Sequence, residues 1–196
     1  MKLLLENEVA PQRKSEAGMT LIELLIAMVV LAVGLGALSI LLTVAIASNN
    51  KNSKDTSATL LAQMVIEQIS SQDPNSSATI TVTDCAGNAW TVATAGGASP
   101  NGAGASLVTN AALLGYGGID QSQLASAIPN GYAMQYVDCA STGPQTRYDV
   151  RWNVMTITAN NTRLITASAR QTGGLSSRLG GQFFALPVTL RGIGGP

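Results

Sequence analysis

An uncharged apolar stretch near the N-terminus, Leu24–Ala47, constrains this chain more than any other feature. It holds 24 residues (47 − 24 + 1), whereas about 20 apolar residues suffice for a helix to cross the hydrocarbon core of a membrane. A carboxylate, Glu23, directly precedes the stretch and opens the same helical segment. A carboxylate at membrane depth is costly and by default functional, so we expect Glu23 to have a partner.

Three other interpretations of this segment stay open. A secretory signal peptide has a shorter apolar core of about 7–15 residues, although Ala45-Ile46-Ala47 fits its small-x-small cleavage pattern. An unprocessed signal anchor explains the length of the segment but neither Gly18 nor Glu23. The third is a buried helix of a soluble protein, because a helix that is apolar on all sides lies in a core or in a membrane.

The residues Gly18-Met19-Thr20-Leu21-Ile22-Glu23 resemble the processing site and helix start of type IV prepilins and type II secretion pseudopilins. In that family a membrane-embedded prepilin peptidase cuts after the glycine, the new N-terminal residue is methylated, and the fifth mature residue is Glu. Counted from Met19, the fifth residue is Glu23. The resemblance therefore implies a processing site at Gly18 and Met19 and a role for Glu23 in assembly.

The segment Tyr148–Val154 and the following strand, Arg163–Arg170, are similar to the late sheet of PilV-type minor pilins, which places this chain nearer a minor than a major pilin. A minor pilin would act in pilus assembly, adhesion, motility or DNA uptake. A type II secretion minor pseudopilin is the alternative, followed by a membrane-anchored binding domain of the envelope.

The resemblance also implies partners and a location. The partners are other pilin subunits, prepilin peptidase and the inner-membrane assembly machinery. The protein would cross the inner membrane once with its head in the periplasm, and then join an extracellular pilus or a periplasmic pseudopilus. Lys2, Arg13 and Lys14 of the leader agree, because basic residues mark the cytoplasmic side. Glu16 and Ala17 depart from the family pattern, in which a basic residue commonly precedes the glycine.

Cleavage would leave a free amine on Met19, one helical turn from Glu23. The Glu23 carboxylate could then neutralise the amine of a neighbouring subunit packed with an axial offset. The helix macrodipole stabilises a first-turn carboxylate by about 0.3–1 kcal/mol, whereas an acidic residue at the centre of a membrane costs roughly 2.5–3.5 kcal/mol. The difference favours a partner in another subunit.

The sequence predicts an α+β fold in which a long N-terminal helix packs on an antiparallel β-sheet head. The expected regions are the leader (1–18), the transmembrane and assembly half of the helix (19–47), an amphipathic spine helix (48–73) and an exported β-rich head (74–196). Gly34 and Gly36 favour either local unwinding or close helix packing. Asp73-Pro74 ends the helix after an apolar stripe with helical spacing: Leu61, Met64, Val65, Gln68 and Ile69.

After Pro74 the hydrophobic period changes to two, which predicts half-buried antiparallel strands. In the clearest of them the buried positions Tyr148, Val150, Trp152 and Val154 alternate with solvated Asp149, Arg151 and Asn153. Further strands are predicted at 79–83, around Trp90 and Val92, and at 131–138, 163–170 and 183–190. Pro187 places the last strand at a sheet edge.

The segment 95–118 is rich in Gly, Ala, Ser and Asn, and it predicts a long surface loop. No phosphate-loop lysine follows its glycines, and Gly115-Tyr116-Gly117-Gly118 lacks the spacing of a dinucleotide fingerprint. We therefore expect no ligand cradle in this loop.

Cys85 and Cys139 are the only cysteines of the chain, and both lie beside predicted strands of an exported head. An oxidising periplasm predicts that they form a disulfide, which would tie the variable loop across the sheet. Two buried free thiols are the alternative.

The composition argues against catalysis. The chain has no His and two Cys, so the common Cys/His zinc sites are excluded, and no spacing suggests a nucleophile with its base. We expect no enzyme activity, cofactor, metal or small-molecule substrate.

From Ala140 onward six Arg accompany one acidic residue, Asp149, which suggests complementary faces between stacked subunits or solvated strand positions. We do not expect nucleic-acid binding, because the Arg are scattered without interleaved aromatic residues. They are Arg147, Arg151, Arg163, Arg170, Arg178 and Arg191.

Overall fold

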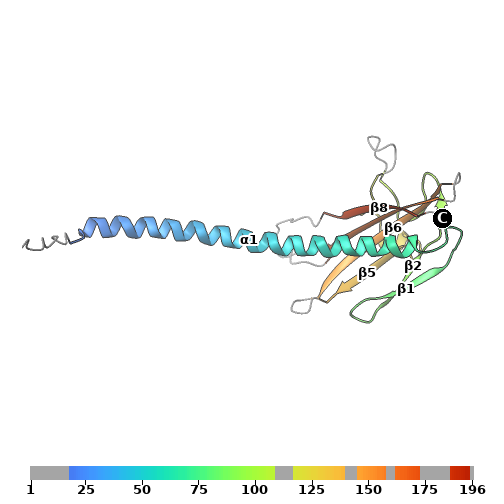
Figure 1. Ribbon diagram of the computed structural model, residues 1–196, viewed down its shortest axis with the longest axis horizontal. Helices are drawn as coiled ribbons and strands as arrows, with labels where there is room; N and C mark the ends of the chain where they lie inside the picture. Colours follow the sequence, from blue (N-terminus) through green and yellow to red (C-terminus); the bar gives the residue numbers. More distant parts are fainter. Residues whose placement is uncertain (1–17, 109–116, 140–144, 158–161, 173–185, 195–196) are drawn as a thin grey trace, which may run out of the picture. The chain divides into compact units, whose positions relative to one another are not determined.

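A computed structural model of the chain describes residues 18–108, 117–139, 145–157, 162–172 and 186–194. It divides the chain into two compact units, Met1–Ser48 and Asn49–Pro196, and helix α1 (Leu21–Ser70) contributes to both. Within the second unit, residues 49–70 of α1 lie against β-strands (Figure 1). The structure therefore confirms the predicted α+β fold of one long helix packed on a sheet.

Two sheets make up the head. The smaller is the antiparallel hairpin of β1 (Thr79–Thr83) and β2 (Ala89–Ala93). The larger has β6 at its centre, with β7 and then the edge strand β8 on one side and β3, β4 and β5 along the other. Only the β3–β6 pair is parallel among the strands described. The larger sheet consists of β3 (Gly97–Ala98), β4 (Ala103–Gly104), β5 (Ala133–Asp138), β6 (Thr146–Ile157), β7 (Thr162–Thr172) and β8 (Val188–Gly194).

The hydrophobic core lies between α1 and the larger sheet. Leu61, Val65 and Ile69 of the predicted stripe are buried, together with Ala58 and Ala62. Trp152 on β6 is completely buried, and its indole N–H donates to the Ala93 carbonyl at 3.1 Å. Burial of these apolar side chains, at about 25 cal/mol per Å², is the main force that holds the helix on the sheet.

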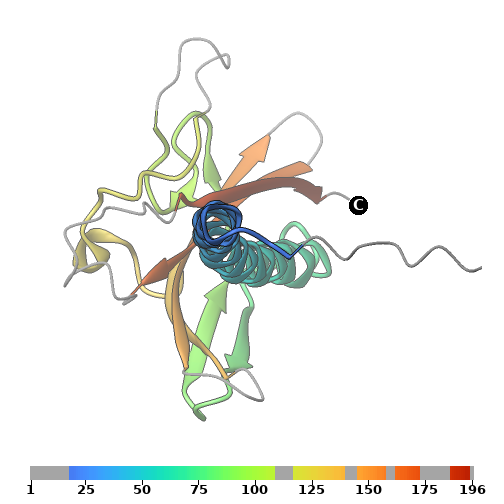
Figure 2. The same ribbon diagram turned by 90° about the vertical axis from the view of Figure 1, so that its left-hand side faces the viewer.

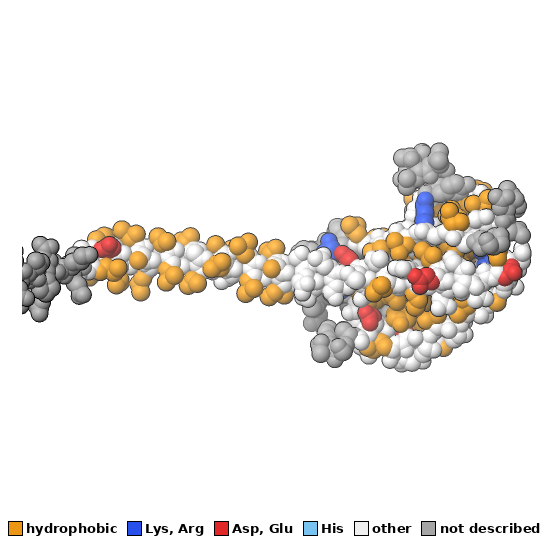
Figure 3. Space-filling model, viewed as in Figure 1, with side chains coloured by type: hydrophobic (Ala, Val, Ile, Leu, Met, Phe, Trp, Pro, Cys, Tyr) orange, Lys and Arg blue, Asp and Glu red, His pale blue; other side chains and the backbone are white. Residues whose placement is uncertain are grey.

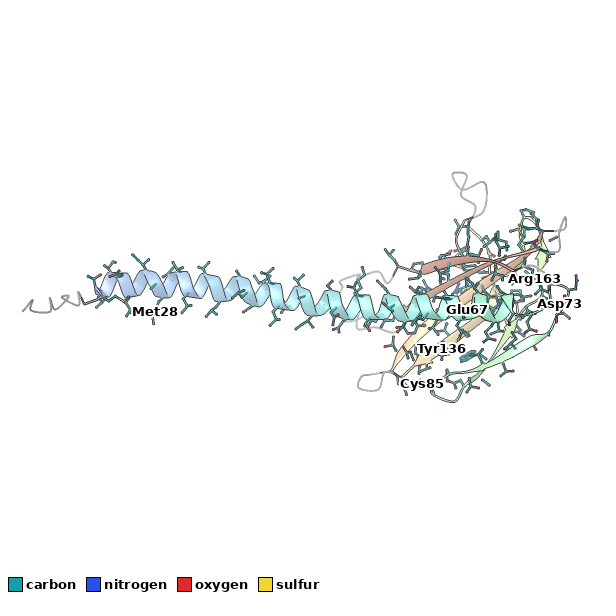
Figure 4. The ribbon with its side chains drawn as sticks, viewed as in Figure 1. Met28, Glu67, Asp73, Cys85, Tyr136 and Arg163 are labelled. Carbon is teal, nitrogen blue, oxygen red and sulfur yellow. A yellow bond between two sulfur atoms is a disulfide. The ribbon has the colours of Figure 1, made fainter. Side chains whose placement is uncertain are left out.

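The segment that follows α1 is held by an arginine from the sheet. Helix α1 ends at Ser70. Beyond it, Nη2 of Arg163 on β7 donates to the carbonyls of Asp73, Pro74 and Ser76. Figure 4 shows Arg163 beside Asp73 at this end of the head. Arg163 is therefore buried, and neither a solvated strand position nor a subunit face, the two interpretations offered for the Arg residues, describes it.

The prediction that β6 is half-buried was wrong. Asp149, Arg151 and Asn153 are as buried as the apolar residues that alternate with them. Arg151 forms a salt bridge with Asp149 at 2.8 Å, and its Nη1 donates to the carbonyls of Asp120 and Gln123. The strand alternates as predicted, but residues 117–124, here called the cover segment, lie over its second face. Figure 2 shows this region, in yellow, at one side of the strands.

The prediction of a long surface loop over residues 95–118 also needs correction. Residues 109–116 lie outside the described part, so the glycine-rich Gly115–Gly118 segment is described only at its last two residues. The rest contributes β3 and β4 to the sheet, and Ala105 is fully buried with its N–H bonded to the Trp152 carbonyl. A Cβ at Gly104 would lie 2.4 Å from the Trp152 carbonyl oxygen, so the glycine permits close pairing of β4 with β6. A Cβ at Gly97 would lie 2.4 Å from the backbone of Gly102, so this glycine permits β3 and the start of β4 to lie close together.

The other predicted elements differ from the structure only at their ends. The helix ends at Ser70, close to the expected stop at Asp73-Pro74. The strand expected at 183–190 begins after Pro187 and continues to Gly194, since Pro187 has no N–H for the ladder; residues 183–185 lie outside the described part. Gly192 lets β8 approach the helix, because a Cβ there would meet Ile66 at 2.4 Å.

The predicted disulfide is present. Cys85 and Cys139 are joined, with 5.8 Å between their Cα atoms. The bond connects the turn of the β1–β2 hairpin to the end of β5, so it ties the two sheets together (Figure 4 labels Cys85). We expected this bond to tie the loop of residues 95–118 across the sheet. It instead ties the β1–β2 hairpin to the larger sheet.

Asp84 makes a second connection next to the disulfide. Its buried carboxylate accepts hydrogen bonds from the N–H and side-chain amide of Asn88, the indole of Trp90 and the N–H of Val137 on β5. Burial raises the pKa of Asp84, but these hydrogen bonds outweigh burial and lower the pKa to about 2. The ionised carboxylate therefore stabilises the hairpin on the sheet.

We predict that loss of the disulfide destabilises the head. The bond closes a segment with a sequence separation of 54, and removal of a native disulfide from a small exported domain costs roughly 2–5 kcal/mol. Urea unfolding of Cys85→Ser/Cys139→Ser against oxidised wild type measures the loss. Reductant should lower the stability of the wild type and leave the double variant unchanged. An equal response of both proteins would contradict a stabilising bond.

The Asp84 interactions predict a pH dependence. A folded pKa of about 2 lies below the value of about 3.9 for an unfolded Asp. The stabilisation is therefore complete above pH 4 and is lost as the pH falls through about 2. The stability difference between wild type and Asp84→Asn should shrink over this range in urea titrations. A difference that stays constant from pH 5 to pH 2 would show that the Asp84 charge does not contribute.

Candidate assembly segment

The described part of the N-terminal unit, residues 18–48, is the exposed first half of helix α1 and the short stretch before it. Every residue from 18 to 53 is exposed, including Met19 at 68% and Leu21 at 83%. On the face that Figure 3 shows, apolar side chains cover the first half of α1, with one acidic side chain near its start. An apolar surface of this extent marks a membrane or protein contact.

The composition of α1 fits a membrane span. It contains an 18-residue window with a mean hydropathy of 2.8, long and apolar enough to cross a bilayer, and none of that window is buried within the chain. The helix continues without a break through Gly34 and Gly36. Among the described residues, no atom outside the helix's own backbone lies within 4 Å of where a Cβ at either glycine would stand.

The predicted processing site lies directly before the helix. Gly18 and Met19 are exposed and belong to the short non-helical stretch 18–20 that precedes Leu21. The peptide bond between them is therefore outside the hydrogen-bonded helix. An exposed bond outside a helix is accessible to a peptidase.

Thr20 caps the helix, a role that we did not predict from the sequence. Its hydroxyl accepts from the Glu23 N–H at 3.4 Å, and its carbonyl accepts from the N–H groups of Glu23 and Leu24 at 3.1 and 3.2 Å. Thr20-x-x-Glu23 is the spacing of a capping box, and this signal could have identified the cap. The cap places Glu23 in the first turn, where the helix dipole favours a negative charge.

Glu23 is the one titratable side chain of the described apolar half of α1, and it is exposed. The structure gives its carboxylate no salt bridge among the described residues. The sequence-predicted site residues thus fall into two places: Gly18, Met19 and Glu23 at the start of α1, and Cys85 and Cys139 in the head. No group of three His, Cys, Asp or Glu that could hold a metal occurs in the described part of the chain.

Comparison with known proteins supports this segment as a processing and assembly signal. Residues 13–39 match the family model of the prokaryotic N-terminal methylation motif. The match includes Gly18, Met19 and Glu23, and it supports a type IV pilin-like or pseudopilin chain. No curated protein and no solved structure matches the chain significantly.

We predict that the Glu23 charge is needed for assembly more than for insertion. Removing one member of a buried ion pair costs roughly 3–5 kcal/mol, and about 1.4 kcal/mol is already tenfold. Glu23→Gln should therefore lower incorporation into filaments at least tenfold and leave membrane insertion and cleavage intact. The measurement is the ratio of variant to wild type in purified filaments divided by the same ratio in membranes.

Glu67→Gln is the matched control, because Glu67 is an exposed helical Glu of the head unit. It should be incorporated like the wild type. A Glu23→Gln variant with equal ratios in filaments and membranes would show that the Glu23 charge does not select subunits.

Proposed function

We propose that this chain is a non-enzymatic structural subunit of a type IV pilin-like filament, and more specifically a minor pilin. In this proposal the peptidase cuts after Gly18, Met19 is methylated at its amine, and α1 anchors the subunit in the inner membrane until assembly. The single observation that carries the proposal is the methylation motif at residues 13–39, which coincides with an exposed apolar helix.

The geometry gives each part a physical task. An exposed apolar helix loses its contact with water equally well in lipid and among identical helices, so one surface serves for storage in the membrane and for polymerisation. Within the polymer, the Glu23 carboxylate would pair with the Met19 ammonium of the next subunit. This pair would set the axial register, because an unpaired charge in an apolar core is far more costly than a paired one.

Support for the minor-pilin assignment comes from the similarity of Tyr148–Val154 and the next strand to PilV-type sheets. These residues form β6 and β7, the central pair of the larger sheet. A minor pseudopilin of type II secretion would carry the same N-terminal motif. The genes beside this one, for a pilus or for a secretion machine, would distinguish the two assignments.

We predict a mature chain that begins at Met19 with a methylated amine. Mass spectrometry of the N-terminal peptide from membranes or sheared filaments measures this directly. Replacing Gly18 with Leu should leave the precursor uncut, because the side chain would obstruct the peptidase. Gly36→Leu, which changes a glycine inside the apolar helix, is the control and should be processed normally.

Two results would overturn the pilin proposal. One is a mature N-terminus at Ser48, which a signal peptidase would produce after Ala45-Ile46-Ala47. The other is an intact Met1 in the exported protein. Normal processing of the Gly18→Leu variant would argue against a prepilin-type peptidase.

A further inference from the structure

Strand β1 is an open edge of the β1–β2 hairpin (Figure 1). The Asp84 N–H donates to the Asn88 carbonyl, so these residues form a hydrogen-bonded antiparallel pair. Hydrogen-bonded and non-hydrogen-bonded pairs alternate along the ladder. The backbone N–H and C=O groups of three residues therefore point away from β2, and the structure gives them no partner within its described part: Thr79, Thr81 and Thr83.

This edge has none of the devices that usually prevent edge pairing, such as charges, prolines and bulges. All five residues from Thr79 to Thr83 are β-branched and uncharged. One edge strand of the larger sheet, β8, differs, because it follows Pro187 and contains Arg191, Gly192 and Gly194. Strand β1 lacks such protection.

The sequence of β1 is nearly the same in both directions. Thr81 is at the centre, with Ile80 and Val82 beside it and Thr79 and Thr83 at the ends. We propose that β1 pairs with β1 of a second, oppositely directed copy of this chain, around a two-fold axis at Thr81. The interface is isologous, as closed two-fold contacts are, and it joins two hairpins into one four-stranded sheet.

The pairing satisfies every open backbone group. Thr81 pairs with Thr81 of the second copy, and Thr79 pairs with Thr83, so that all three outward N–H groups of each strand find a carbonyl. Ile80 lies opposite Val82 in the non-hydrogen-bonded pairs, where side chains approach most closely. Thr–Thr and β-branched cross-strand pairs are favourable in sheets.

The hairpin is held in place before it pairs. A lone two-stranded hairpin is marginally stable in water, but this one is fixed to the larger sheet by the disulfide, by Asp84 and by the bond from the Ala93 N–H to the Gly131 carbonyl. An edge that is already ordered loses little entropy on binding. The connections around Cys85 thereby also hold β1 ready for a partner.

One such contact is small. Five residues from each copy bury far less than the roughly 800 Å² per partner of a standard interface. Pairing in solution is therefore weak and depends on concentration. Where many copies lie side by side, as in filaments of opposite direction, the contacts act together. This last consequence rests on the proposed function, whereas the pairing itself does not.

Cysteine cross-linking of the full chain in detergent tests the pairing. Cα atoms of a hydrogen-bonded pair lie about 5.5 Å apart, within the range that a disulfide spans. Thr81→Cys should therefore give a covalent dimer on oxidation. Thr91→Cys is the matched control, because Thr91 is the exposed neighbour of Thr81 on β2. Its copies would be about three strand spacings, or roughly 14 Å, apart. We expect at least about a tenfold difference in dimer yield.

A mixture of Thr79→Cys and Thr83→Cys proteins tests the register. The two-fold arrangement predicts a cross-link between the two variants, and little between two copies of either one. Thr81→Lys should abolish cross-linking in this mixture when it is added to both variants, because the two ammonium groups would meet at the axis. Thr91→Lys, with the same charge one strand away, should leave it unchanged. Peptide mapping of the Cys85–Cys139 bond verifies that each variant is folded.

Equal dimer yields from Thr81→Cys and Thr91→Cys would overturn the proposal, as would the absence of a Thr81→Cys dimer at high protein concentration. Dimers of Thr79→Cys with itself would show a parallel or shifted contact, and would also contradict the two-fold arrangement. The cross-linking results do not depend on where the mature chain begins. The proposed function is tested separately, by mass spectrometry of the mature N-terminus.

Discussion

Arg151 and Trp152 are neighbours on β6, and their side chains enter opposite faces of a sheet that excludes water on both. On one face the indole of Trp152 lies in the apolar core beneath α1. On the other, the Arg151 guanidinium binds Asp149 and two carbonyls of the cover segment. A buried guanidinium is costly unless it is paired and hydrogen-bonded, as Arg151 is. The positions of the cover segment, of β4 and of the helix therefore all depend on this one strand.

The helix and most strands of the larger sheet could be predicted from the sequence because their apolar residues recur with a period. Leu61, Val65 and Ile69 repeat every four residues, and Tyr148, Val150 and Trp152 every two. No such period marks β3 and β4, whose two residues each are Gly or Ala. The second face of β6 was misread for a related reason. Asp149 and Arg151 are polar, and polar residues on a strand indicate solvent unless the structure supplies partners from distant segments.

For the assembly segment, the sequence predicts the motif residues but not their contacts. Gly18, Met19 and Glu23 were identified from a local motif, and the structure adds the Thr20 cap that fixes Glu23 in the first turn. The partner of Glu23 cannot be identified from a single chain, since no described residue of this chain forms a salt bridge with it. The disulfide could be predicted from the sequence because two cysteines allow one pairing. Its role in joining two sheets could not be predicted, because that role depends on the topology.

The disulfide also sets how far this chain can be stretched. Cys85 and Cys139 are 54 positions apart in the sequence, yet their Cα atoms are 5.8 Å apart. An extended chain gains roughly 3.3–3.6 Å per residue, so these positions correspond to about 180 Å of contour length. While the bond is intact, tension applied at the two ends of the chain bypasses β2, β3, β4 and β5, and passes from β1 to the end of β5 through two sulfur atoms. The protein under load would thus keep its hairpin turn and β5 joined even after β6, β7 and β8 had been pulled apart.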